Sequence, residues 1–255
     1  MNKARYSAAA VLLLGFAFGG NGEVDLFHRL EGPGPAHFLG TDELGRDLFL
    51  RWWLGGARAL ALGLGLTALH LFCGTSAALL AHPSPLLRRA LLAVSDTLAS
   101  IPSLLLCLFL LAFLRPGFGA LVLALAVGGW IPYARLSLSQ LDALKSDPSL
   151  QQARLLGAGR LHLWRSHLLP RLWPVLSAQA AVGIGAVALA EGGLSFLGLG
   201  LPPEQASWGS MLAAGRAFLL VSPWQVIWPS LGLLTLLLAT EAMRSQGGDV
   251  REKTG

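Results

Sequence analysis

Long runs of apolar residues, separated by short polar segments, constrain the fold of this chain more than any other feature. Five runs are long enough for a helix to cross a hydrocarbon layer of about 30 Å: Ala57–Ala81, Ala90–Leu114, about Gly119–Leu138, Leu172–Leu197 and about Trp224–Met243. Only 13% of the 255 residues are charged, against roughly 25% in soluble domains. The sequence therefore predicts an all-α, polytopic membrane protein.

A shorter apolar run, Tyr6–Gly20, follows Lys3 and Arg5. It is short against the roughly 20 residues of a spanning helix, and two interpretations stay open. It is either a sixth transmembrane helix or a cleaved signal peptide, because a basic start, a short apolar stretch and small residues near the end also suit the latter. Both interpretations place Asn21 outside the membrane.

The charged residues predict the orientation. The net charge is +5, but the cations are scattered at the ends of apolar runs, which suits membrane topology rather than nucleic-acid binding. Residues 21–56 lean acidic and are predicted to lie outside, while most of the 19 lysines and arginines fall on the other side. We expect a multi-pass membrane protein with both termini on the cytoplasmic side. Its predicted parts are 1–56 (first helix and external segment), 57–243 (core domain) and 244–255 (cytoplasmic tail).

A polar, basic island, Asp147–Pro170, interrupts the apolar runs on the predicted inner side. Asp147 can cap a helix that begins at Pro148. Gly157-Ala158-Gly159 would end that helix after about two turns, and a second short helix would reach Pro170. We predict a cytoplasmic docking element. The alternative is a basic amphipathic hairpin that rests on anionic lipid.

Two external segments carry local signals. Gly32–Pro35 blocks regular structure, and a capping residue followed by acidic residues predicts a helix that starts near Thr41. With Trp52 and Trp53 on it, residues 41–54 would form an interfacial amphipathic helix. Farther on, glycines and Pro202 forbid a continuous helix past Leu197, so this segment should fold back over the outer mouth as a re-entrant or scoop-like loop.

The sequence lacks the motifs of several enzymes. It contains no G-x-x-x-x-G-K-[ST], no G-x-S-x-G and no H-E-x-x-H, so it offers no phosphate-cradling loop and no hydrolytic site of these kinds. His162 and His167 are five residues apart and would not share a helix face as zinc ligands. We predict no catalytic residue and no metal site.

The island resembles a known family. Gln151-Gln152-Ala153 with Gly157, followed by His167–Pro170, is similar to the E-A-A-x-x-x-G loop of ABC importer membrane subunits. The resemblance implies a coupling helix that grips an ATPase. It would assign coupling roles to nine residues: Gln151, Gln152, Ala153, Arg154, Gly157, Ala158, Gly159, His167 and Pro170. Gln151 stands where the family has an acidic residue, which removes any salt bridge made there.

Two further stretches resemble the C-type permease of dipeptide, oligopeptide and nickel importers. They are G-T-D-x-x-G-R-D from Gly40 to Asp47, and E-G-G-L-S-F-L-G-L-G-L-P-P from Glu191 to Pro203 with Ser207-Trp208-Gly209 after it. The apolar runs make six transmembrane helices when Tyr6–Gly20 is counted as a span. The resemblance would assign an outer gate or interface role to Thr41, Asp42, Gly45, Arg46, Asp47 and Trp208.

The same resemblance implies a place in the cytoplasmic (inner) membrane of a prokaryote, 57–243 as the core permease domain, and a set of partners. A B-type permease would complete the pore, an extracytoplasmic binding protein would deliver solute, and two ATP-binding subunits would bind ATP and Mg²⁺, so that this chain holds no cofactor. The expected cargo is peptides, with a nickel chelate or a glutathione-like solute as alternatives. A membrane-embedded enzyme and an ATP-independent channel remain the alternatives from other classes.

Three ionisable residues lie in or near the spans: His70, Asp96 and Glu191. A charge at mid-membrane costs at least about 2.5–3.5 kcal/mol, so each is expected to face the bundle interior or water and is a candidate for lining the pathway. The alternative is that Asp96 and Glu191 lie near span ends and hydrogen-bond neighbouring helices. Kinks rather than substrate contacts are expected at the prolines Pro102, Pro132 and Pro229.

Overall fold

The computed structural model describes residues 22–115, 117–155, 157, 159–201 and 205–252. Within these residues the regular structure is helical, apart from one isolated bridge between Thr41 and Asp47. The predicted all-α architecture is therefore confirmed. The apolar run at residues 6–20 lies outside the described residues.

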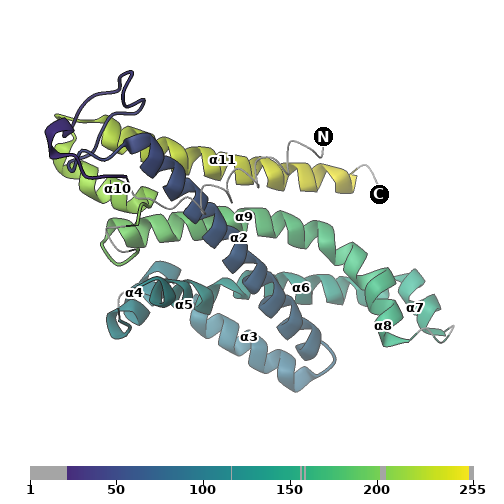
Figure 1. The fold of residues 1–255 in the computed structure, drawn as a ribbon. Coiled ribbons are helices and arrows are strands. Elements are labelled where there is room, and N and C mark those ends of the chain that lie inside the picture. Colours follow the sequence, from purple (N-terminus) through teal and green to yellow (C-terminus); the bar gives the residue numbers. More distant parts are fainter. Residues whose placement is uncertain (1–21, 116, 156, 158, 202–204, 253–255) are drawn as a thin grey trace. The chain divides into compact units, whose positions relative to one another are not determined.

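The longer helices in chain order are α2 (Leu48–Ala81), α3 (Pro85–Ala99), α4 (Ser103–Phe113), α5 (Phe118–Gly129), α6 (Ile131–Ala143), α9 (Leu169–Phe196) and α11 (Trp224–Glu252) (Figure 1). Short helical segments connect them: η1 (Leu26–His28), η2 (Leu144–Ser146), α7 (Pro148–Leu155), α8 (Arg160–Leu163), η3 (Trp164–Leu168), α10 (Trp208–Gly215) and η4 (Arg216–Phe218).

Four segments of the described chain are long and apolar enough to cross a membrane: Leu48–Ala81, Phe118–Ala143, Leu169–Phe196 and Trp224–Ser245. The segment 118–143 consists of α5 and α6, which meet at Trp130 with Pro132 in the first turn of α6. α3 and α4 together pass the same test as one bent pair.

The predicted span Ala90–Leu114 is not one helix, which corrects the expectation of a continuous run. α3 and α4 meet at an angle of 84°. Between them, Ser100 closes α3 by donating its backbone N–H to the carbonyl of Asp96, and Pro102 follows shortly after. The residue before a proline is pushed out of the helical region, so Ile101 cannot continue the helix. The kink expected at Pro102 is in fact a complete break.

The described residues form two compact units, each with its own core. The first consists of residues 22–64, Cys107–Leu125 and Gly185–Leu238. Its core gathers residues of α2, α9 and α10: Leu48, Ala59, Ala188, Trp208 and Met211.

The second unit consists of Gly65–Leu106, Ala126–Ile184 and Ala239–Gly255. Its core is built from α6 and α9: Tyr133, Leu141, Leu172 and Leu176. α2 approaches α6 closely within this unit, because a Cβ atom on Gly74 would lie 2.7 Å from the Cβ of Tyr133. Small residues allow such close approach of membrane helices.

Candidate functional site

The predicted docking element begins as the sequence indicates. α7 starts at Pro148, and Oδ1 of Asp147 accepts hydrogen bonds from the backbone N–H groups of Ser149 and Leu150 at 2.9 and 3.3 Å. A carboxylate in this position satisfies N–H groups that have no partner inside the helix. The side chain of Leu150 is buried and anchors the helix in the second unit.

The rest of α7 is presented to the surroundings. Gln151 and Gln152 are exposed, and Leu155 near the end of the helix has 87% of its surface exposed. Gln151 turns its amide back to the carbonyl of Lys145, 3.3 Å away. An exposed leucine flanked by neutral amides suits docking to another protein better than it suits free solution.

The turn after α7 is also as predicted. Gly157 adopts φ +80° with no atom within 4 Å of the place where a Cβ would sit. This left-handed conformation costs glycine little and other residues more. Gly159 is exposed, whereas Ala158 and the side chains of Arg154 and His167 lie outside the described part of the structure.

The second short helix does not end at Pro170, which corrects the prediction. α8 passes through the π-helical segment η3 directly into α9, and Pro170 lies in the first turn of that long helix. Pro170 has no N–H to donate to the preceding turn, and it lies just after the π-helical segment, where the regular α-helical hydrogen-bond pattern is already interrupted. Figure 1 shows α7 and α8 as a pair of short helices that precede α9.

The predicted gate residues at 41–47 come together in the first unit, but as a loop. The Asp42 carboxylate accepts hydrogen bonds from the backbone N–H groups of Leu44 and Arg46, both at 2.9 Å. It also forms ion pairs with Arg46 at 2.7 Å and Arg51 at 3.5 Å. The Thr41 hydroxyl donates to the carbonyl of His28. Because these side chains are occupied by the loop, the helix predicted from Thr41 begins only at Leu48.

Asp47 takes the capping role instead, since its Oδ1 accepts from the backbone N–H of Leu50 at 3.0 Å. Residues 41–54 are therefore a loop followed by the first turns of α2, not an interfacial helix. Gly45 has φ +72°, and a Cβ there would collide with the carbonyl of Asp25. The glycine, aspartate and arginine of this motif are thus explained by one tight loop.

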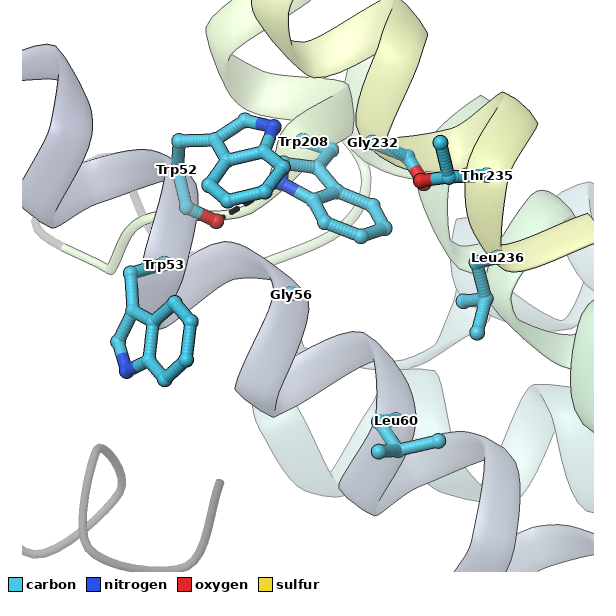
Figure 2. A pocket seen from close by; sticks show the side chains of 8 residues that line it. All are labelled: Trp52, Trp53, Gly56, Leu60, Trp208, Gly232, Thr235 and Leu236. Carbon is cyan, nitrogen blue, oxygen red and sulfur yellow. Dashed lines mark hydrogen bonds between the residues drawn. The ribbon is translucent and has the colours of Figure 1, made fainter. Parts of the chain in front are cut away.

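Residues of three helices, including three tryptophans, line a pocket of about 240 Å³ in the first unit. Trp52 and Gly56 of α2, Trp208 of α10 and Gly232 of α11 are among its lining residues (Figure 2). Figure 2 shows the rings of Trp52 and Trp208 against each other while Trp53 points away from them. The Trp52 indole donates to the carbonyl of Trp228 at 2.8 Å. Trp52, which was predicted to lie on an aromatic face at the membrane interface, therefore makes an internal contact instead.

The segment between α9 and α10 is held by a buried carboxyl group. The Ser195 hydroxyl donates to Oε1 of Glu191 at 2.6 Å and accepts from the backbone N–H of Leu201 at 3.4 Å. Glu191 is 1% exposed. It is therefore placed to fix the fold-back after α9 through Ser195, which lies on the same helix. α9 ends at Phe196, one residue before the predicted stop.

The other two pathway candidates have different surroundings. His70 is buried in the second unit against Gly129, where a Cβ would fall on the imidazole ring. Asp96 is largely exposed and pairs with Arg135 at 2.6 Å. Both candidates belong to the second unit, whereas Glu191 belongs to the first. The pathway role of all three stays a prediction.

Sequence reasoning missed three ion pairs in the second unit. Arg171 pairs with Asp147, Arg135 pairs with Asp96, and Arg88 makes two hydrogen bonds to Asp142 at 3.1 and 2.5 Å. Each pair joins residues more than 20 positions apart, so no local spacing indicates it. The available signal was the presence of an acid and a base at the ends of different apolar runs.

Residues 70–245 match the family described as the binding-protein-dependent transport system inner membrane component. The chain belongs to this family. It is therefore the permease subunit of an ABC importer, a membrane component whose energy comes from ATP hydrolysis in separate partner subunits.

Individual relatives carry more specific names. The permease is 36% identical over 222 residues to a probable peptide ABC transporter permease of Sinorhizobium fredii, with 86% of this chain and 76% of the relative covered. It is 34% identical to the nickel transport system permease of Escherichia coli, with 85% and 78% covered. It is 36% identical to a probable D,D-dipeptide transport system permease of Escherichia coli, with 83% and 71% covered.

The fold is shared with a solved importer. A structure of the MetNI methionine ABC transporter in an inward facing conformation covers 79% of this chain and 94% of the matched chain, with a TM-score of 0.60 and 19% identity. At this identity the likeness concerns the fold alone.

Proposed function

We propose that this permease translocates peptides, as the C-type subunit that pairs with a B-type permease. An extracytoplasmic binding protein delivers the peptide, and two ATP-binding subunits engage the inner loops. The proposal draws on relatives named for peptide and D,D-dipeptide transport. The second candidate cargo is a nickel chelate, because another relative is named for nickel transport.

The observation that carries the coupling role is the form of α7. This helix is capped by Asp147 at one end, is terminated by Gly157 at the other, and presents Leu155 to the surroundings. An ATPase that closed around such a helix would cover the exposed leucine and the amides of Gln151 and Gln152. Since Gln151 is neutral, the contact at this position rests on hydrogen bonds and apolar burial rather than on a salt bridge.

The orientation follows from charge. Residues 140–171 carry exposed cations such as Arg165 and Arg171, which the positive-inside rule places in the cytoplasm. The Gly40–Asp47 loop, which lines a small pocket together with Met211 and Ala214 of α10, would then lie outside. In this orientation both termini are cytoplasmic, and the loop and the fold-back line the face that the binding protein approaches.

Two measurements test the proposal. In vesicles that hold the assembled importer and its binding protein, uptake of labelled di- and tripeptides should require ATP, and unlabelled nickel–histidine should not compete. Uptake without ATP would support a channel, while competition by the nickel chelate would favour the second candidate.

Contact with the ATPase is tested separately by cross-linking. A cysteine at Leu155 should cross-link to an ATP-binding subunit, whereas a cysteine at Phe72, which is 71% exposed on α2, should not. If the Leu155→Cys variant assembled fully but did not cross-link to an ATP-binding subunit, α7 would be excluded as the docking helix.

A further inference from the structure

We propose that the ion pair between Asp147 and Arg171 joins α7 and the base of α9 into one lever, so that movement of the docking helix is passed to a membrane-spanning helix. This inference rests on the proposed docking role of α7. It assigns Asp147 and Arg171 as positioning residues that act within this chain, without contact to ATP or to the transported solute.

The pair is part of a closed ring of three side chains. Arg171 forms an ion pair with Oδ2 of Asp147 and donates from Nη2 to the Ser149 hydroxyl at 2.9 Å. That hydroxyl donates in turn to Oδ1 of Asp147 at 2.6 Å. The first turn of α7 is thereby tied to a residue more than 20 positions away. Charge-assisted bonds of this kind are stronger and more directional than neutral ones.

The ring supplies what the packing of α7 lacks. Among the α7 side chains that the structure describes, Leu150 alone is buried. A single apolar anchor fixes the position of a short helix but not its rotation about that anchor. The second attachment at Arg171 removes this freedom. A two-turn helix has few hydrogen bonds of its own to resist displacement, so both attachments are needed for it to transmit force.

The base of α9 is built to turn as a short rod. On its N-terminal side lies the π-helical segment η3, in which the backbone N–H of Leu169 donates to the carbonyl of Trp164. On its other side Pro174 lies inside the helix and has no N–H to donate to the preceding turn. Both features weaken a helix locally and are common positions of bending. Arg171 lies between them, so a displacement of α7 would swing this rod and bend α9 at Pro174.

The lever can be separated from the helix cap by substitution. Asp147→Asn keeps a good capping residue and removes the charge that pairs with Arg171. Arg171→Gln removes the same ion pair and leaves the cap intact. If the ion pair is the operative element, the two single variants and the double variant should show the same defect, because residues that act as one unit are not additive.

The first test measures whether α7 and the base of α9 move together. Spin labels are placed at Leu155 and Trp173, which are 87% and 56% exposed, after replacement of Cys73 by Ser and Cys107 by Ala. In the assembled importer the distance between the labels should stay the same with and without ATP–vanadate. In Arg171→Gln it should shift and broaden when nucleotide binds. A nucleotide-dependent distance in the parent, or an unchanged distance in Arg171→Gln, would overturn the lever.

The second test measures coupling in Asp147→Asn, Arg171→Gln and the double variant. All three should co-purify with the ATP-binding subunits as the parent does. The amount of ATP hydrolysed per labelled di- or tripeptide imported should rise by about twofold to thirtyfold, the range seen for residues along a coupling route. Arg171→Lys should retain most of the coupling, and Arg165→Gln, an exposed arginine of the same region, should behave like the parent. If the coupling defect of the double variant equalled the product of the two single-variant defects, Asp147 and Arg171 would not act as one unit. Failure of the Leu155 cross-link would instead refute the docking role.

Discussion

The indole N–H of Trp208 donates a hydrogen bond to the backbone carbonyl of Trp52, 2.9 Å away. The two residues are 156 positions apart in the chain, and their rings are 6.0 Å apart between centroids. Trp208 also fills the space left by two glycines, since a Cβ on Gly56 or on Gly232 would lie 2.6 Å from its ring. One side chain therefore fastens α10 to both α2 and α11 within the first unit.

Replacement of Trp208 by Ala should destabilise the permease strongly. The side chain is 6% exposed, and loss of a buried tryptophan typically costs about 3–5 kcal/mol. The thermal midpoint of the detergent-solubilised importer measures the effect. Trp173→Ala removes a tryptophan that is 56% exposed and should change the midpoint little. Equal midpoints for the two variants would contradict the packing role of Trp208.

Gly209→Ala should disturb the fold-back, because a Cβ there would collide with the backbone carbonyl of Gly192. Backbone cannot move aside as a flexible side chain can, so a cost of about 1–3 kcal/mol is expected. Gly193→Ala is the matched control, since its Cβ would meet no atom within 4 Å. Thermal midpoint and uptake are the measurements, and a greater loss in Gly193→Ala would reverse the assignment.

Gly157→Val should weaken association with the ATP-binding subunits. Gly157 has φ +80°, and a branched residue in this region typically costs about 1–3 kcal/mol of strain. No atom crowds the site, so the effect is on the backbone alone. Gly159→Val, at an equally open position without positive φ, should associate normally. The measurement is the amount of ATP-binding subunit that co-purifies with each variant. Full association of Gly157→Val would favour the lipid-resting hairpin as the account of this region.

The attachment of α7 should survive moderate acid. The hydroxyl of Ser149, the backbone N–H groups and Arg171 lower the pKa of Asp147 from 3.8 to about 2. A carboxyl group whose pKa is lowered in the folded state contributes stability above its unfolded pKa, and this is lost as the pH falls from about 3.8 to about 2. The mobility of a spin label at Leu155 should stay constant down to about pH 4. A rise in mobility between pH 6 and pH 5 would exclude Asp147 as the group responsible.

The topology is checked by labelling single cysteines with an impermeant reagent. Pro33 and Gly159 are both exposed, and they lie in the segments assigned to opposite sides of the membrane. Pro33→Cys should react from outside in intact cells, whereas Gly159→Cys should react only after the membrane is opened. The opposite pattern would invert the orientation.

Features that depend on neighbours in the chain could be predicted from the sequence. The apolar runs indicate spanning helices because no other regular structure of this composition satisfies its backbone in lipid. The cap at Asp147 and the left-handed turn at Gly157 are set by local hydrogen bonding and by the absence of a Cβ. The end of α9 could be placed within one residue because the glycines and Pro202 that follow it act locally on the backbone.

Features that depend on distant residues were decided by the tertiary structure. Thr41 and Asp42 are good residues for starting a helix, but their oxygen atoms bind groups between His28 and Arg51, and that competition moved the start of α2 to Leu48. Capping preference is a local property, and contacts with residues outside the capped segment overrode it here. The ion pair of Asp147 with Arg171 has the same origin, because the sequence supplies both charges while the path of α9 brings them together.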